Sequence, residues 1–274
     1  MWGVVEEIFQ GFRSYRANRS ARNIDQALCA PGDFWLFILG VNNSGTTVLA
    51  KLLETHPAIR ALPAEGQLLT DAFPRPDRLG VERLWSARMD LFRWTEDHDS
   101  TSALQAKKDW LQHYPKRPGI LLEKSPPNTL RSRWLQKHFT PSRFLGIVRH
   151  PYAVCEGIRR RRNYSIEEAA QHWFIANTCL LEDMEFLSHN LLIRYEDLVG
   201  NPEHCLNQVQ DFIGIAQRSL QDACENVEAH SLEGNTSGLI NLNEKSFGNL
   251  SSGDLKSINR ICGSLMSRFG YEQH

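Results

Sequence analysis

The sequence predicts a three-layer α/β fold, in which helices flank a central parallel sheet on both faces. Four short, almost continuously apolar runs are typical of strands that are buried on both faces. These runs span 34–41, 119–124, 143–149 and 190–194. Helical patterns alternate with them along the chain, which is the order that a parallel sheet requires. These patterns span 46–54, 128–137, 166–187 and 203–212. A short fifth strand at 59–62 and a last helix at 254–269 are also expected.

The composition is that of an ordinary soluble protein with one large α/β domain and insertions. The chain has 274 residues, of which 41% are hydrophobic and 23% charged, and its formal net charge is −1. A charge so close to zero gives no reason to expect binding to nucleic acid or to an anionic membrane. No stretch approaches the roughly 18 uninterrupted apolar residues of a membrane span.

The six cysteines are widely scattered, and none forms a C-x-x-C pair. This spacing fits neither a zinc site nor a disulfide framework, so we interpret the cysteines as small core residues. The start of the chain has Glu6 and Glu7 within its apolar part, which argues against a signal peptide. Together these features predict a cytoplasmic location.

The loop from Gly40 to Thr47 lies between the first strand and the first helix and carries the strongest functional signal. Its spacing matches the phosphate-binding pattern G-x-x-x-x-G-K-S/T, except that Thr46 stands in place of the lysine. The backbone N–H groups and the positive end of the helix dipole remain available to an anion. We therefore predict a P-loop-like fold whose loop binds a phosphate-like or sulfate-like group. The alternative is a capped turn that binds nothing.

Two basic residues end other predicted strands, Lys124 and Arg149. The carboxyl ends of parallel strands meet at one edge of the sheet, so both side chains are expected near the loop. Arg149 suits a second phosphate, because its guanidinium is permanently charged and planar. Lys124 is placed to stabilise charge on a leaving phosphate. The alternatives are an arginine that caps a carboxylate and a surface lysine.

Other charged groups receive weaker assignments. The run 159–162, four arginines, is interpreted as a solvated helix face from which one member can reach a phosphate. Glu196 and Asp197 are expected to form a structural ion pair with a basic residue of the site. No cluster of metal ligands is visible, and no metal is expected.

Several motifs, in this order and spacing, resemble the sulfotransferases that use 3′-phosphoadenosine 5′-phosphosulfate (PAPS). The motifs are GVNNSGTTVLAKLLETHP, PAEGQLL, LLEKSPPNTLR, IVRHPYAVCEGI, AAQHWFIAN, IRYEDLVGNPEHCLNQVQDFIGI and LMSRFGY. The resemblance runs from about residue 34 to 271 and is greatest to the branch with bacterial, Golgi carbohydrate and tyrosylprotein enzymes. That family has a P-loop-like α/β fold with a parallel sheet.

The resemblance implies a site. The loop residues Asn42, Asn43, Ser44, Gly45, Thr46 and Thr47 correspond to the 5′-phosphosulfate loop. Arg149 corresponds to a ligand of the 3′-phosphate, and Glu65 to the general base. Two positions depart from the family, which usually has Ser where Gly157 stands and Arg or Lys where Asn43 stands. Lys124 is the candidate that replaces this missing cation, and His56 is an alternative base that is more simply a helix-end cap.

The predicted reaction is transfer of a sulfonate group from PAPS to a hydroxyl or amine, with 3′,5′-adenosine bisphosphate (PAP) as product and without a metal. The acceptor is a small molecule, a carbohydrate or a protein; tryptophans within 86–110 either stack on sugars or form a helical cap over the core. We expect one domain over 1–274, with an N-terminal helical extension at 1–30, an acceptor-side helical insertion at 66–118 and a substrate or lid loop at 230–250. The alternatives are a P-loop kinase whose lysine is displaced, to Lys51 or Lys124, and a catalytically weak nucleotide-binding protein of the same fold. The sequence does not indicate an oligomeric state.

Overall fold

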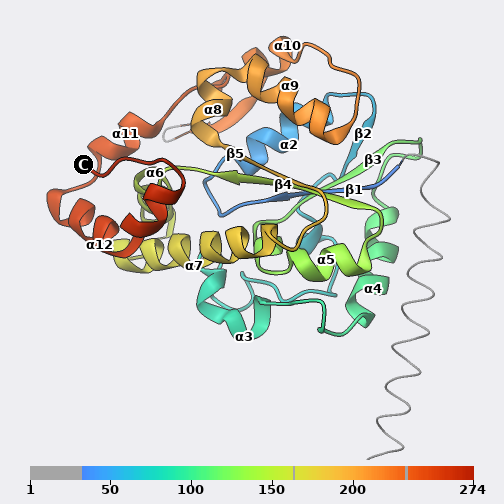
Figure 1. Cartoon of the computed structure of the whole chain (residues 1–274), viewed down its shortest axis with the longest axis horizontal. Coiled ribbons are helices and arrows are strands. Elements are labelled where there is room, and N and C mark those ends of the chain that lie inside the picture. The colour runs from blue at the N-terminus through green and yellow to red at the C-terminus, as the bar shows by residue number, and fades with distance from the viewer. Residues whose placement is uncertain (1–32, 163, 232–233) are drawn as a thin grey trace, which may run out of the picture.

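A five-stranded, wholly parallel sheet forms the centre of the molecule (Figure 1). The computed structural model describes residues 33–162, 164–231 and 234–274, so the predicted extension at 1–30 lies outside the described residues. The strand order is β2-β3-β1-β4-β5. The strands are β1 (Trp35–Leu39), β2 (Ile59–Ala61), β3 (Ile120–Lys124), β4 (Ser142–Val148) and β5 (Asn190–Arg194). All five predicted strands are therefore present, and the predicted fold class is confirmed.

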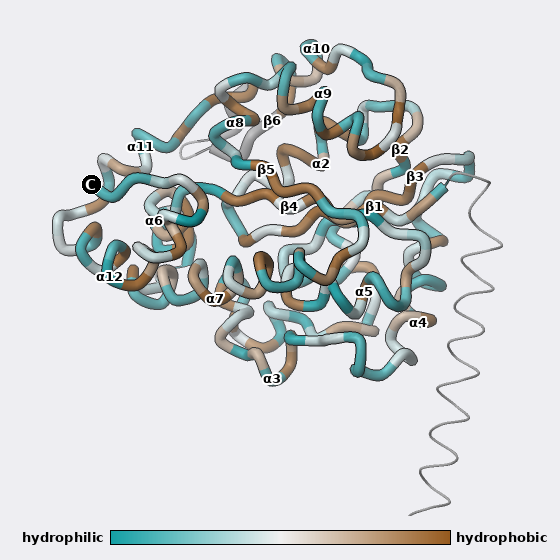
Figure 2. Tube along the Cα trace, viewed as in Figure 1, coloured by the Kyte–Doolittle hydropathy of each residue, from teal (hydrophilic) through white to brown (hydrophobic). Residues whose placement is uncertain are grey.

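Two apolar clusters on opposite faces of the sheet explain the three layers. Alternate residues of β1 point to opposite faces, so Trp35 and Phe37 belong to one cluster, while Leu36 and Ile38 belong to the other. Figure 2 shows the strands as a hydrophobic band through the middle of the molecule. Every residue of β1 is buried because β1 pairs with β3 on one side and β4 on the other. Burial on both faces is why the strand sequences are almost continuously apolar.

Helices cover both faces of the sheet (Figure 1). On one face lie α2 (Thr46–Glu54), α8 (Tyr195–Gly200), α9 (Pro202–Ile213) and α10 (Gln221–Asn226). On the other face lie α3 (Met89–Phe92), α4 (Thr101–Leu111), α5 (Ser132–His138) and α7 (Ile166–Met184). At one end of the sheet are α6 (Pro151–Arg162), α11 (Asn243–Gly248) and α12 (Ser252–Arg268).

Local signals account for the helix boundaries. Capping boxes start two helices, with Ser165 and Glu168 at α7 and Ser251 and Asp254 at α12. The predicted helix at 128–137 is wrong at its start, because Pro126–Leu130 forms a 3₁₀ helix, η3, and α5 begins only at Ser132. The five cysteines of the described residues are free and buried, which agrees with their interpretation as core residues.

The segment 66–118 consists of short helices packed on the sheet. It contains two 3₁₀ helices, η1 (Gly66–Leu68) and η2 (Trp85–Arg88), before α3 and α4. Trp94 and Trp110, the tryptophans within 86–110, are both buried, as is Trp85 just before them, so the structure supports the helical cap and not sugar stacking. The segment 230–250 is more regular than its sequence suggests, because it enters the hairpin of β6 (Glu228–Ser231) and β7 (Gly234–Ser237) and includes α11.

Candidate active site

The loop between β1 and α2 has the geometry of an anion cradle. Gly40 and Gly45 have positive φ angles of 151° and 98°, and Asn43 adopts the left-handed conformation with φ 68°. A Cβ on Gly40 would lie 2.5 Å from the Ile147 carbonyl oxygen, so the loop passes too close to β4 for any side chain. No side chain caps the start of α2 at Thr46, which leaves its first N–H groups directed at the space beyond the loop.

The side chains of Asn42 and Asn43 are held by the segment after η1. The Trp85 indole N–H donates to Asn42 Oδ1 at 2.9 Å, and Arg83 Nη1 donates to Asn43 Oδ1 at 3.0 Å. Gly157 lies directly beside Asn43, because a Cβ on Gly157 would be 3.0 Å from Asn43 Nδ2. The two positions that depart from the family pattern are therefore neighbours, and the Asn43 side chain occupies the space next to the glycine.

Arg149 is fixed at the end of β4 by three contacts. Its Nη1 donates to the Asn43 carbonyl at 3.1 Å, and its Nε donates to Asn243 Oδ1 at 2.8 Å. The guanidinium also lies 4.2 Å from the centre of the Tyr195 ring, a favourable cation–π distance. Burial lowers the pKa of Arg149, although an arginine remains protonated at neutral pH.

The expected ion pair between an acidic residue and a basic site residue takes an indirect form. Glu196 accepts hydrogen bonds from Asn243 Nδ2 at 2.7 Å and from the Tyr271 hydroxyl at 2.8 Å. Glu196 therefore acts on Arg149 through the amide of Asn243 and not through a direct ion pair. The prediction of a structural, non-catalytic role agrees with this arrangement, whereas the predicted direct contact is wrong.

Glu65 and Lys124 form a close pair beside the loop. Lys124 Nζ lies 2.7 Å from Glu65 Oε1 and donates to Thr47 Oγ1 at 3.1 Å. Gln67 Nε2 donates to the other carboxylate oxygen of Glu65 at 2.6 Å. The Lys124 side chain is 12% exposed and that of Glu65 is 25% exposed, so both groups remain open to a ligand. A carboxylate and an ammonium group thus stand next to the loop.

One open cavity of about 490 Å³ joins these groups. Of the predicted site residues it is lined by Asn42, Asn43, Gly45, Thr46, Thr47, Glu65, Lys124 and Arg149. Ser44 and Gly157 are not part of its lining. Ser44 is fully buried, and no described residue hydrogen-bonds to its hydroxyl. His56 is also buried and contacts backbone atoms of Ala216 and Ala58, so its role is structural.

Sequence reasoning missed several residues that line the same cavity. Arg83 belongs to none of the quoted motifs, and Tyr195 lies in one of them but is given no role in the site by the sequence. The fold brings both residues to the loop. Arg161 was foreseen only as one unspecified member of the arginine run that can reach a phosphate. Its neighbours in the run are ion-paired, Arg160 with Glu156 and Arg162 with Glu82.

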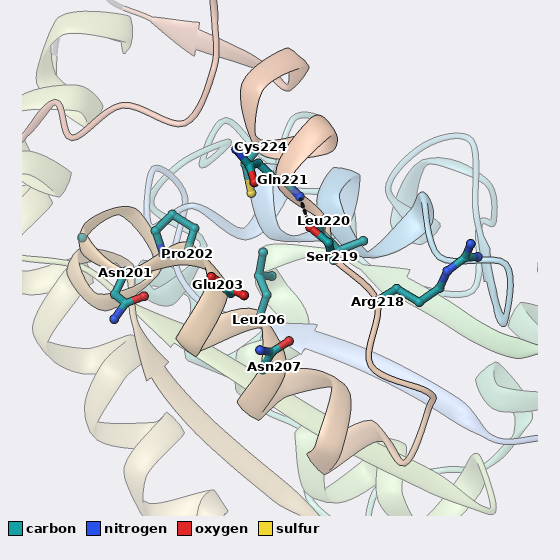
Figure 3. Close-up of a pocket in the computed structure, with 11 residues that line it drawn as sticks. Asn201, Pro202, Glu203, Leu206, Asn207, Arg218, Ser219, Leu220, Gln221 and Cys224 are labelled. Carbon is teal, nitrogen blue, oxygen red and sulfur yellow. Dashed lines mark hydrogen bonds between the residues drawn. The ribbon is translucent and has the colours of Figure 1, made fainter.

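A second cavity, of about 370 Å³, lies between α9 and α10 (Figure 3). Asn201, Glu203, Arg218 and Gln221 are among its lining residues, and no residue of the loop contributes to it. Within 33–162, 164–231 and 234–274, no His, Cys, Asp or Glu side chains gather in threes or more as a metal ion would need. No helix in these same ranges combines the length and apolar character needed to cross a membrane.

Comparison with known proteins shows the family of the chain. A model of the sulfotransferase family matches residues 36–219, which is more than half of the chain. Nodulation protein NoeE of Sinorhizobium fredii is 30% identical over 130 residues, a match that spans 45% of this chain and 30% of that protein.

Two solved structures share the fold. The sulfotransferase domain of the Synechococcus olefin synthase has a TM-score of 0.56 and 22% identity, and the alignment covers 86% of this chain and 94% of that one. The sulfotransferase domain from the curacin biosynthetic pathway has a TM-score of 0.51 and 20% identity, with 88% and 99% of the two chains covered. From the family match over 36–219, the chain belongs to the sulfotransferase family.

Proposed function

We propose that this sulfotransferase takes its sulfonate group from PAPS and transfers it to a hydroxyl or amine of a carbohydrate, small-molecule or protein acceptor. One observation carries the proposal: a single cavity joins the uncapped start of α2, the Lys124–Glu65 pair and Arg149. A donor with phosphosulfate at one end and a separate phosphate at the other matches two anion-binding groups at different strand ends.

The residues of the cavity fit this donor. The N–H groups at the start of α2 suit the 5′-phosphosulfate, and they need no lysine at position 46. Arg149 suits the 3′-phosphate, because Asn243, Tyr195 and the Asn43 carbonyl already hold its guanidinium in place. The cavity volume of about 490 Å³ lies within the range of small-molecule sites.

The chemistry follows from the same contacts. Glu65 takes the proton of the acceptor hydroxyl while that oxygen forms a bond to sulfur. The bond between sulfur and the phosphate oxygen breaks, and its electron pair remains on the phosphate of PAP. Lys124, together with the N–H groups of the loop, stabilises this developing charge. The contacts of Lys124 support this role, since its ammonium lies 2.7 Å from Glu65 and 3.1 Å from the hydroxyl of Thr47, the second residue of α2.

The acceptor is proposed to approach over the segment 66–118. This segment supplies Leu68 and Arg83 to the cavity, and Leu68 is 48% exposed. The segment 230–250 contributes Leu242 to the rim and Asn243 to Arg149, which supports its assignment as a substrate loop. A smaller cavity of about 200 Å³ on the other side of Glu65 and Lys124 offers further room next to the proposed base.

Calorimetric titration tests the nucleotide site. PAP without magnesium is expected to bind, and Arg149→Ala is expected to weaken that binding by about 10- to 100-fold, the effect of losing a charge-assisted contact. An acceptor screen with PAPS follows, with Glu65→Gln as the inactive control that still binds PAP. No binding of PAP, with ATP bound only in the presence of magnesium, would refute the proposal and favour the kinase. PAPS bound without turnover on any acceptor would favour a nucleotide-binding protein.

A further inference from the structure

We propose that Arg83, on the acceptor-side segment, supplies the cation that contacts the sulfonate group of the donor. The inference rests on the proposed function and gives the role of sulfonate ligand to a residue that lies about 40 positions after the loop. In this chain the loop residue that Arg83 contacts is Asn43, whose side chain is neutral.

The position of Arg83 is fixed by its neighbours. Arg83 Nη1 donates to Asn43 Oδ1, and two residues later the Trp85 indole donates to Asn42 Oδ1. Trp85 in turn packs edge-on against His172, with ring centres 4.5 Å apart. The next residue, Ser86, is anchored to His172 Nδ1 by a buried hydrogen bond of 2.7 Å. A segment tied to the loop and to α7 in this way presents a guanidinium at a defined place.

The charge around Arg83 indicates an anionic ligand. Arg83 is half-buried and lines the cavity together with Lys124, Arg149 and Arg161. Among the described residues, no carboxylate lies within ion-pair distance of Arg83, and the nearby Glu82 is paired with Arg162. Burial, followed by the repulsion from Arg161 and Arg162, lowers the pKa of Arg83. The carboxylates of Glu65 and Glu82 offset only part of this pKa shift. Half-buried cations without a carboxylate partner are stabilised when an anion joins them.

The sulfonate is the anionic group that Arg83 is placed to meet. The 3′-phosphate is assigned to Arg149, which contacts the backbone carbonyl of Asn43. Arg83 contacts the side-chain oxygen of the same residue and comes from the segment on which the acceptor is proposed to lie. Arg149 therefore reaches the loop from the nucleotide side and Arg83 from the proposed acceptor side.

Binding of two nucleotides without acceptor tests the inference, because PAPS carries the sulfonate and PAP lacks it. In Arg83→Gln, the affinity for PAPS is expected to fall by about 10- to 100-fold, while that for PAP changes less than about threefold. Arg83→Lys retains the charge and is expected to recover most of the PAPS affinity. The matched control is Arg78→Gln, since Arg78 lies on the same segment, is paired with Asp71 and does not line the cavity.

Three outcomes would overturn the inference. If Arg83→Gln weakens the binding of PAP as much as the binding of PAPS, Arg83 contacts the 3′-phosphate or only positions Asn43. If it weakens neither, Arg83 contacts no part of the donor. If Arg83→Gln has a changed melting temperature and Arg83→Lys does not recover PAPS affinity, the role is structural. Failure of the proposed function is distinct, because the unmodified protein would then bind neither nucleotide.

Discussion

Replacing Gly45 by alanine probes the contact between the loop and Arg149. Gly45 has φ 98°, and a Cβ there would lie 2.6 Å from Cδ2 of Tyr195. The ring of Tyr195 is the surface on which Arg149 rests. Gly45→Ala therefore combines backbone strain with a forced movement of the ring that supports the proposed phosphate ligand.

The size of the effect follows from these two contributions. A left-handed conformation costs an alanine about 1–2 kcal/mol. Insertion of a methyl group into occupied space costs about 1–3 kcal/mol more. The free energy of unfolding of Gly45→Ala is thus expected to fall by about 2–5 kcal/mol. The affinity for PAP is expected to fall by about tenfold or more, because Arg149 loses its support.

Gly80 provides a matched control. Its φ is also positive, 69°, but a Cβ there would meet no atom within 4 Å. Gly80→Ala is expected to lose only about 1–2 kcal/mol of stability through strain and to leave PAP affinity unchanged. Urea denaturation measures the first quantity and calorimetric titration the second, so the difference between the two variants isolates the contact with Tyr195.

Two results would refute this reasoning. Equal destabilisation of both variants would show that the contact between Gly45 and Tyr195 costs nothing. Full PAP affinity in Gly45→Ala would show that the loop and the supported Arg149 do not form the nucleotide site.

Three further predictions concern the residues behind the loop. Gly66→Ala is expected to lower the free energy of unfolding by about 2–4 kcal/mol, because its Cβ would lie 2.7 Å from Glu123 Oε1 and 2.8 Å from the Trp110 ring. Gly248→Ala is the control, because a Cβ there would meet no atom within 4 Å. Urea denaturation measures both variants, and a loss in Gly66→Ala no larger than in Gly248→Ala would contradict the packing described for Gly66. Burial raises the pKa of Glu123 from 4.5 to about 7, so the folded state holds an extra proton between these values, and the stability that this carboxyl contributes below pH 4.5 is lost as the pH rises to 7. Glu123→Gln is expected to remove this pH dependence, a change of at most about 3 kcal/mol in the free energy of unfolding between pH 4.5 and 7.5. An unchanged pH dependence in the variant would show that the Glu123 carboxyl is not its source. Lys124→Met is expected to lower kcat by about 10²- to 10³-fold while PAP affinity stays within about threefold. Steady-state kinetics measures kcat and calorimetry measures PAP affinity. A fall in PAP affinity with kcat unchanged would contradict the role assigned to Lys124.

Local sequence signals were enough to predict the sheet and most of the loop. Strands buried on both faces must be almost continuously apolar, so all five appear as short apolar runs. The carboxyl ends of parallel strands meet at one edge, and this rule alone placed Lys124 and Arg149 in one cavity with Gly45 and Thr47. The misplaced helix start at 128 has a local cause, because two prolines turn the chain into η3 first.

The segment 66–118 shows where local signals fail. The sequence around Trp94 and Trp110 is compatible either with sugar stacking or with core packing, and only the burial of the two side chains decides between these roles. Trp85 is buried because its ring meets His172 and its indole reaches Asn42, residues that lie 87 positions after it and 43 positions before it. No periodicity reports contacts over such separations.

The sequence by itself determined the α/β class, the glycine-containing loop between the first strand and the first helix, and the basic strand ends, because each depends on periodicity or on residues next to one another. Tertiary structure alone decided which side chains share the cavity with the loop. Tyr195 beneath Arg149, Asn243 between Arg149 and Glu196, and the guanidinium of Arg83 beside Asn43 all join residues at least 40 positions apart. Such contacts arise only when the sheet has brought its strand ends together and the packed helices have fixed the segments around them.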